Sequence, residues 1–429
     1  MRRTTWIWLW VILGIAGESS AQTTWSERTL GGMRTLVYAP TTHSPRGGRG
    51  LMVVLHGCTQ QPEAYRDRGG LTEPAEAFGV VIAAPAVPNG GVYAGCWDYY
   101  GANHTRSTRH DGPVLRMVDE LLGDASLEID PAQVYVAGLS SGGGEAAILG
   151  CLAPDVFAGV GINAGPAVGT EASQIATVAA NATMARASCR QLAGNQADQF
   201  ATQLASIAYG SSDYIVARGY GPVHAEALAG LYASPALESA PLDVTMLRGH
   251  QPRGTGEVWA DAEGPRITRI EITGMGHAWP AGTGAGSELS FIASQGPSWP
   301  WHLLELFTTQ NRRAGGGPLP VDAGFDDQGQ PVDSGPRPDA ALPGRDAQVR
   351  DSGGASDAGS VVDLGVAGPM EEGEMSGGCG CRTHRRRTNA GPGWGLGLLG
   401  FVWWRLRLRA TLAWTRVQLR PTSRRADNG

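Results

Sequence analysis

Short apolar runs alternate with segments of helical periodicity over most of the chain, up to about residue 310. Residues 51–55 and 133–137 are rich in β-branched, aromatic and other apolar side chains, as buried strands are. Residues 114–122 repeat apolar side chains at the spacing of an amphipathic helix. This alternation predicts one α/β domain, large enough for its own core, in which helices pack on a mostly parallel sheet.

Residues 138–142 have the sequence GLSSG and lie between the predicted strand 133–137 and a predicted helix that opens at 143–149. Glycines two positions either side of Ser140 permit a sharp turn that presents the serine hydroxyl at the sheet edge. The start of a helix also favours developing negative charge. The pattern predicts Ser140 as a catalytic nucleophile, and the alternative is a chance match in a glycine-rich chain.

Residues 56–60, HGCTQ, follow the predicted strand 51–55. In α/β-hydrolases the loop after an early strand supplies one N–H of the oxyanion hole, and the residue after the nucleophile supplies the other. The amides of Cys58 and Ser141 are therefore the predicted donors. Losing one such donor typically costs about 3–4 kcal/mol of transition-state stabilisation. An ordinary strand-to-loop turn is the alternative interpretation.

A general base and an acid are expected downstream, in the order serine, acid, histidine. His277 lies in a glycine-flanked loop after the alternating run 266–272, where this fold places its base. Asp213 follows a mostly apolar run that ends in a glycine-serine turn, so it is the predicted acid, with a solvated turn residue as the alternative. Asp243 is the rival, but it precedes the apolar residues 244–247, a predicted strand, and so lies at the wrong sheet edge.

Together with GCW at 95–97, YGSSD at 209–213 and GHAWP at 276–280, these motifs resemble those of the polyhydroxybutyrate depolymerase family of secreted esterases, over about residues 29–309. The resemblance implies an α/β-hydrolase fold with a mostly parallel central sheet and flanking helices. Relatives usually have Ala where this chain has Ser141, and His where it has Tyr209, but the Ser141 N–H is unaffected.

What the resemblance implies for function is carboxylic ester hydrolysis by Ser140, His277 and Asp213, with no cofactor or metal ion. The substrate would be a poly(3-hydroxyalkanoate), or a plant polysaccharide ester, since the family includes feruloyl and acetylxylan esterases. Trp97 and Trp279 would lie in the substrate pocket. A non-catalytic surface-binding protein and a peptidase of the same fold are the alternatives, although intact triad candidates argue against the first and the motifs against the second.

The family motifs also contain Cys58 and Cys96, and a disulfide between them would brace the oxyanion loop against the loop that carries Trp97. Cys151 and Cys189 are candidates for a second bridge, but sequence does not fix connectivity. Cys151 is equally well explained as a small buried residue of its helix.

The N-terminus has the features of a signal peptide: a basic start, an apolar run at 6–16 and small residues before an expected cleavage after Ala21. The alternative, a retained membrane helix, is disfavoured because the apolar run is short of the ~20 residues that a bilayer requires. The chain contains no lysine, which excludes Schiff-base and Ser-Lys mechanisms. Its net charge of −6 gives no indication of a nucleic-acid partner.

The expected domain boundaries are a signal peptide at 1–21, an esterase domain at 22–312, a spacer at 313–378 and a C-terminal tail at 379–429. The spacer is rich in Gly, Pro and Asp and has too little apolar area to fold by itself. The tail combines cysteines, an apolar run and many arginines and resembles myxobacterial-type sorting signals, which implies attachment to the membrane or cell surface. A Cys-x-Cys metal site is the alternative for Cys379 and Cys381. Within the esterase domain, residues 170–203 are either a helical cap or plain surface helices.

Overall fold

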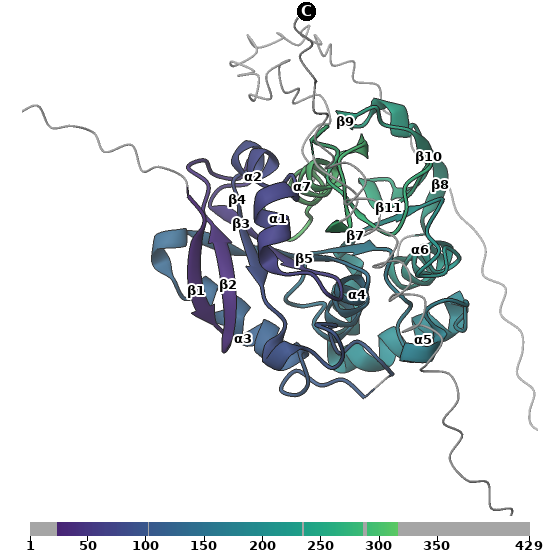
Figure 1. Cartoon of the computed structure of the whole chain (residues 1–429), viewed down its shortest axis with the longest axis horizontal. Coiled ribbons are helices and arrows are strands. Elements are labelled where there is room, and N and C mark those ends of the chain that lie inside the picture. The colour runs from purple at the N-terminus through teal and green to yellow at the C-terminus, as the bar shows by residue number, and fades with distance from the viewer. Residues whose placement is uncertain (1–23, 102, 234–235, 286–289, 316–429) are drawn as a thin grey trace, which may run out of the picture. The chain divides into compact units, whose positions relative to one another are not determined.

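The computed structural model describes residues 24–101, 103–233, 236–285 and 290–315 (Figure 1). The predicted signal peptide and tail, and nearly all of the predicted spacer, lie outside these residues. Within them, ten strands form one sheet. In spatial order the strands are β1 (Ser26–Leu30), β2 (Met33–Tyr38), β4 (Val80–Pro85), β3 (Arg49–Leu55), β5 (Ile129–Leu139), β6 (Gly159–Asn163), β7 (Leu204–Gly210), β11 (Gly264–Ile272), β10 (Gly254–Asp261) and β8 (Glu238–Leu242).

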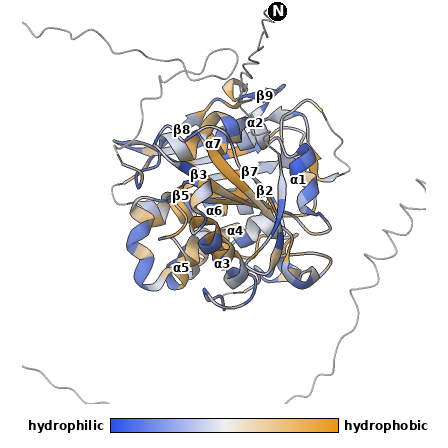
Figure 2. Ribbon diagram, turned by 90° about the vertical axis from the view of Figure 1, so that its left-hand side faces the viewer, coloured by the Kyte–Doolittle hydropathy of each residue, from blue (hydrophilic) through white to orange (hydrophobic). Residues whose placement is uncertain are grey.

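The six central strands, from β4 to β11, run parallel, and two antiparallel strands extend the sheet at each edge. The central strands are buried on both faces, so they read in the sequence as continuous apolar runs. Figure 2 shows these hydrophobic strands at the centre, with helices whose outer faces are hydrophilic around them. The predicted α/β-hydrolase fold is confirmed.

Seven α-helices surround the sheet in the described part of the chain. They are α1 (Pro62–Arg68), α2 (Thr72–Phe78), α3 (Asp111–Leu122), α4 (Ser141–Leu152), α5 (Ala182–Ala193), α6 (Tyr220–Tyr232) and α7 (Trp299–Thr309). Two short strand pairs lie outside the main sheet: β12 (Trp279–Pro280) with β13 (Ile292–Ala293), and β9 (Gly249–His250) with β14 (Gly296–Pro297). Among the residues that the model describes, no helix is both long and apolar enough to cross a membrane.

The strand order reverses at β3, because β4 pairs with one side of it and β5 with the other. In open α/β sheets, ligands bind at the carboxyl ends of the strands beside such a reversal. The loop after β3 and the turn after β5 therefore meet at a position where the topology favours a binding site.

Two segments differ from the sequence-based expectations. Residues Val244–Met246 form a 3₁₀ turn and not a strand, because the Asp243 carboxylate accepts a hydrogen bond from the Thr245 N–H at 2.9 Å and caps the turn. The folded domain also extends past the predicted boundary at 312: the Arg313 guanidinium donates to the Pro154 and Gln199 carbonyls, and Ala314 is buried.

The segment 170–203 contains a 3₁₀ turn (Ala172–Gln174), α5 and a second 3₁₀ stretch (Gly194–Ala201). The helix α5 packs against α4 and α6 and is tied to α4 by a disulfide between Cys151 and Cys189. Ala172 and Ile175, at the start of the segment, reach the active-site cavity described below. The arrangement is that of a surface helical layer whose first turn borders the site.

Candidate active site

Ser140 lies at the turn between β5 and α4, with φ 60° and ψ −119°, a left-handed conformation that is strained for a residue other than glycine. The two flanking glycines are required by close backbone contacts. A Cβ on Gly142 would lie 2.3 Å from the Leu55 carbonyl oxygen, and one on Gly138 would lie 2.3 Å from the Gly142 carbonyl oxygen. The turn therefore has the geometry of a nucleophile elbow, with Ser140 half-buried at the mouth of a cavity.

His277 and Asp213 form a hydrogen-bonded pair, in which Nδ1 of the imidazole lies 2.8 Å from Oδ2 of the carboxylate. Their side chains are only 6% and 1% exposed. The other oxygen of Asp213 accepts hydrogen bonds from the N–H groups of Ile215, at 2.9 Å, and Val216, at 3.1 Å. These bonds fix the carboxylate, which in turn orients the ring through its Nδ1.

A cavity of about 510 Å³ brings the predicted residues together. Ser140, His277, Cys58 and Ser141 all line it, while Asp213 lies behind His277. Asp243, the rival acid, is exposed on its 3₁₀ turn and does not border the cavity.

The N–H groups of Cys58 and Ser141 have no hydrogen-bond acceptor within the described residues, so they are available for a substrate oxygen. Gln60 holds the Cys58 loop in place: its carbonyl oxygen accepts from the Gly57 N–H at 2.7 Å, and its amide donates to the Ser290 carbonyl at 2.9 Å. The sequence motif contained Gln60, but its role as a brace was not predicted.

His56 supports the same loop from below. Its Nδ1 lies 2.8 Å from the Gly57 carbonyl oxygen, and its Nε2 accepts a hydrogen bond from the Val87 N–H at 3.2 Å. Burial lowers the pKa of His56, which keeps the ring neutral. A neutral ring that donates from Nδ1 and accepts at Nε2 satisfies both contacts.

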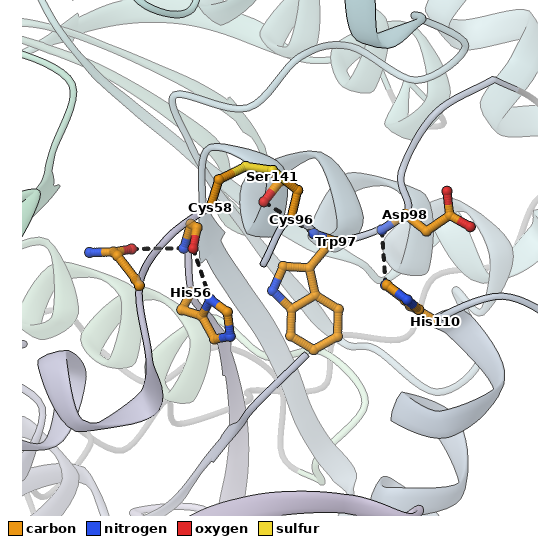
Figure 3. Close-up of a disulfide and its surroundings, with 9 residues drawn as sticks. His56, Cys58, Cys96, Trp97, Asp98, His110 and Ser141 are labelled. Carbon is orange, nitrogen blue, oxygen red and sulfur yellow. Dashed lines mark hydrogen bonds between the residues drawn. A yellow bond between two sulfur atoms is a disulfide. The ribbon is translucent and has the colours of Figure 1, made fainter. Parts of the chain in front are cut away.

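The Cys58–Cys96 disulfide joins the loop after β3 to the loop that precedes Trp97, with the two Cα atoms 4.2 Å apart (Figure 3). Beside it, the Trp97 N–H donates to the Ser141 hydroxyl at 3.3 Å. The serine that replaces the usual alanine at position 141 therefore adds a link between the nucleophile helix and the disulfide loop.

Trp97 and Trp279 do not line the cavity, and their predicted place in the substrate pocket is wrong. Both side chains are 0% exposed. The Trp97 ring lies between His56 and His110 (Figure 3). The Trp279 indole donates to the Gly69 carbonyl at 3.0 Å and packs on neighbouring aromatic rings. Both residues are close in sequence to site residues, Cys96 and His277, but their rings are held in the interior by these contacts.

The aromatic side chains that do line the cavity are those of Tyr93, Tyr99, Tyr100 and Phe291. Phe291 contacts the catalytic-site imidazole edge-on, with ring centroids of Phe291 and His277 6.1 Å apart. Within the described residues, no three His, Cys, Asp or Glu side chains are grouped so that they could hold a metal ion.

Comparisons with known proteins find similar sequences among esterases. The family model described as esterase PHB depolymerase matches residues 36–228. The chain is 38% identical over 317 residues to poly(3-hydroxybutyrate) depolymerase of Ralstonia pickettii. The match covers 70% of this chain and 63% of the relative. It is 30% identical over 246 residues to poly(3-hydroxyalkanoate) depolymerase C of Paucimonas lemoignei, and this match covers 55% of this chain and 56% of the relative. The chain thus spans less than two thirds of the length of these curated relatives.

Among solved structures, the acetyl xylan esterase of Aspergillus awamori matches 59% of this chain and 94% of its own, at 18% identity and a TM-score of 0.46. The sheet topology described above is that of an α/β-hydrolase. In sequence, the chain is similar to the esterase PHB depolymerase family over residues 36–228.

Proposed function

We propose that this protein is a secreted serine esterase that hydrolyses a poly(3-hydroxyalkanoate) through an acyl-enzyme on Ser140. The observation that carries the proposal is the shared cavity: the Asp213–His277 pair borders the same space as Ser140 and two unpaired backbone N–H groups. A nucleophile, an oriented base and an oxyanion site are the parts that acyl transfer requires.

In the proposed reaction, Nε2 of His277 removes the proton of the Ser140 hydroxyl as its oxygen attacks the ester carbonyl. The carbonyl oxygen becomes an oxyanion that the N–H groups of Cys58 and Ser141 stabilise. The tetrahedral intermediate then breaks its C–O bond, and His277 returns the proton to the leaving alcohol. A water molecule, deprotonated by the same imidazole, attacks the acyl-enzyme and releases the acid.

The rim of the cavity supports a polymeric, apolar substrate. Tyr93 and Ile215 line the cavity although they are 72% and 45% exposed, and the adjacent Tyr214 is 91% exposed. Large apolar side chains exposed together are uncommon on soluble proteins and indicate a binding surface. Such a rim suits a water-insoluble polyester, and the higher identity to polyhydroxyalkanoate depolymerases than to xylan and feruloyl esterases agrees with this choice.

A feruloyl or acetylxylan esterase is the second candidate. The observation that favours it is the exposure of two tyrosines, Tyr93 and Tyr214, because aromatic rings also pack against sugar rings and phenolic groups. Product assays on polyhydroxybutyrate film, feruloylated xylan and acetylated xylan, run in parallel, separate the two candidates: the proposal requires the fastest release from the polyester.

The catalytic claim is tested by the rate of hydrolysis of a soluble chromogenic short-chain ester. Ser140→Ala should abolish turnover, whereas the control Ser239→Ala, at an exposed position of edge strand β8, should retain the wild-type rate. Equal rates for Ser140→Ala and wild type would favour the alternative of a non-catalytic binding protein.

The proposed extracellular location is supported by the two disulfides, which persist in oxidising compartments. We further propose that the tail at 379–429 holds the enzyme at the cell surface. Truncation after Gly315, which keeps the packed residues Arg313 and Ala314, should leave an active esterase and move it from the envelope fraction to the medium. Identical fractionation of the two forms would contradict the anchoring role.

A further inference from the structure

Two buried carboxyl groups, one on α3 and one on α4, lie close enough to interact in the interior. Glu145 lies on α4, one turn beyond Ser141, and Asp111 is the first residue of α3. Both side chains are 0% exposed. Neither the esterase mechanism nor the sequence motifs assign a role to this pair.

The pair leaves three oxygen atoms without a hydrogen-bond partner among the described residues: both carboxyl oxygens of Glu145, and Oδ1 of Asp111. Two carboxylates can only accept hydrogen bonds, so in that state these buried oxygens would remain unsatisfied and would repel each other. A single proton between the two groups removes the repulsion and gives two of the three oxygens a partner, because a protonated carboxyl donates to the other.

The remaining oxygen of Asp111, Oδ2, lies 2.9 Å from Nδ1 of His104. Nε2 of the same imidazole lies 3.0 Å from Nη1 of Arg109. The directions agree if Arg109 donates to His104, His104 donates to Asp111, and the shared proton lies between Asp111 and Glu145. The observed contacts thus run from Asp111 through His104 to Arg109, and a shared proton would extend them to Glu145 on α4.

Arg109 connects this chain to the wall of the active-site cavity. Its Nη1 donates to the Tyr100 carbonyl at 2.8 Å, and its Nε donates to the Asp98 carboxylate at 2.8 Å. The rings of Tyr99 and Tyr100 line the cavity, and the Tyr99 ring packs so closely on Gly144 that a Cβ there would lie 2.7 Å from it. The loop of Asp98–Tyr100 is thus fixed by Arg109 on one side, while the Cys58–Cys96 disulfide fixes the residues just before it.

We propose that Glu145 is a positioning residue: it shares one proton with Asp111 and, through His104 and Arg109, holds the Tyr99–Tyr100 wall of the cavity in place. This inference rests on the proposed esterase function for its effect on turnover. The proton-sharing itself is a property of the fold and is measurable without any substrate.

The electrostatic surroundings of Glu145 favour the protonated form. Burial first, and then the neighbouring Asp111 and Asp98, raise its pKa well above the ordinary value of 4.5, while Arg109 opposes the shift. Burial also lowers the pKa of His110, the neighbouring imidazole at the start of α3, so that ring stays neutral and adds no positive charge to the cluster.

The raised pKa gives a signed expectation for stability. The folded state binds a proton more tightly than the unfolded state, so the contribution of Glu145 is fully present below about pH 4.5 and is lost as pH rises through its folded pKa. The same ionisation should loosen the Tyr99–Tyr100 wall of the cavity. Two adjacent carboxylates repel each other and have no shared proton to form a hydrogen bond. Wild-type stability should therefore decline as pH rises above about 4.5 until Glu145 is ionised in the folded state, and kcat/KM should decline with that ionisation.

The test compares Glu145→Gln, which keeps a neutral hydrogen-bonding group of the same shape, with wild type and with the control Glu226→Gln at an exposed position of α6. Thermal unfolding and kcat/KM for a soluble ester are measured across a pH series. Glu145→Gln should lack the part of the stability decline above about pH 4.5 that Glu145 contributes, and the control should reproduce the wild-type profile. Glu145→Leu should raise KM, since displacement of a binding group by even 1 Å can cost on the order of 10²-fold.

Carbon-13 NMR of the glutamate carboxyl groups in the full-length wild-type protein provides the second measurement, which needs neither a folded variant nor turnover. The expected result is one carboxyl, assigned to Glu145, that keeps its proton as pH rises well above 4.5. Absence of such a carboxyl, or a stability decline above about pH 4.5 that Glu145→Gln leaves unchanged, would overturn the proposal. A failed esterase assay with a protonated Glu145 would count against the proposed function alone.

Discussion

The two sides of the active-site cavity are built differently. The oxyanion side, formed by the loops around Cys58 and Cys96, is cross-linked by a disulfide and further braced by the buried side chains of His56 and Gln60. The side that carries Asp213 and His277 is held by hydrogen bonds and by the ring of Phe291, and it carries the exposed Tyr214 and Ile215 next to the acid.

The difference corresponds to what each side must do. Donors of an oxyanion hole stabilise charge only if they are already in place when it develops, so rigidity directly benefits the rate. The other side exchanges a proton and also meets the substrate at the rim, so it combines one fixed pair of residues with an open surface. We therefore expect the activity of the first side to depend on its disulfide. We expect the activity of the second side to depend on single side chains.

Replacing the base should have the largest effect. His277→Ala removes the proton acceptor and should lower kcat by on the order of 10⁴–10⁶, with a much smaller change in KM. Asp213→Asn should cost about 10⁴, because the amide favours the wrong imidazole tautomer. Initial rates on a soluble ester measure both, with the exposed His43→Gln as the control. A loss of less than tenfold in either variant would remove that residue from the proposed mechanism.

Gly142→Ala should disrupt the turn that both sides share. The new Cβ would lie 2.3 Å from the Leu55 carbonyl oxygen and 2.6 Å from that of His56. We expect a loss of roughly 3 kcal/mol or more in the free energy of unfolding, measured by denaturant titration. Gly123→Ala is the control, since its Cβ would meet its nearest atom, the Asp119 carbonyl oxygen, at an ordinary 3.4 Å. Equal stability of the two variants would contradict this account of the elbow.

The two disulfides offer a matched comparison, because both join cysteines that are 38 residues apart. Replacing either pair by serine should therefore cost a similar free energy of unfolding, about 2–4 kcal/mol. Only loss of Cys58–Cys96 should also lower kcat, by on the order of tenfold, because that bridge holds an oxyanion donor. Kinetics well below the unfolding temperature of each variant distinguish the two effects. Equal kcat values for the two serine variants would show that the oxyanion loop does not depend on its cross-link.

The smallest expected effect is an acid-dependent loss of stability from the core. Burial lowers the pKa of His302 from 6.5 to about 4, so its contribution is present above pH 6.5 and is lost as pH falls toward 4. The free energy of unfolding should fall by about 2 kcal/mol between pH 7 and pH 5 on this account. His302→Gln should reduce that slope, and the exposed His43→Gln should not. If the free energy of unfolding of His302→Gln depends on pH as strongly as that of wild type, a group other than His302 causes the acid sensitivity.

Much of the fold could be predicted because parallel strands buried on both faces give continuous apolar runs, and the elbow glycines are a local signal. The prediction of a strand at 244–247 failed because one Asp243 cap was enough to form a turn in a short apolar run. The directions of Trp97 and Trp279 depend on tertiary packing, which a motif does not encode. The pairing of Glu145 with Asp111 is likewise a contact between two helices that no local pattern indicates.

The central claim is that Ser140 is the nucleophile, and labelling by a fluorophosphonate followed by peptide mass mapping tests it most directly. Such a reagent reacts with a serine that an adjacent base activates. The account predicts one phosphonylated residue, Ser140, with loss of ester hydrolysis in step with labelling and no label in His277→Ala. Labelling at a different residue, or full hydrolytic activity after Ser140 is modified, would contradict it.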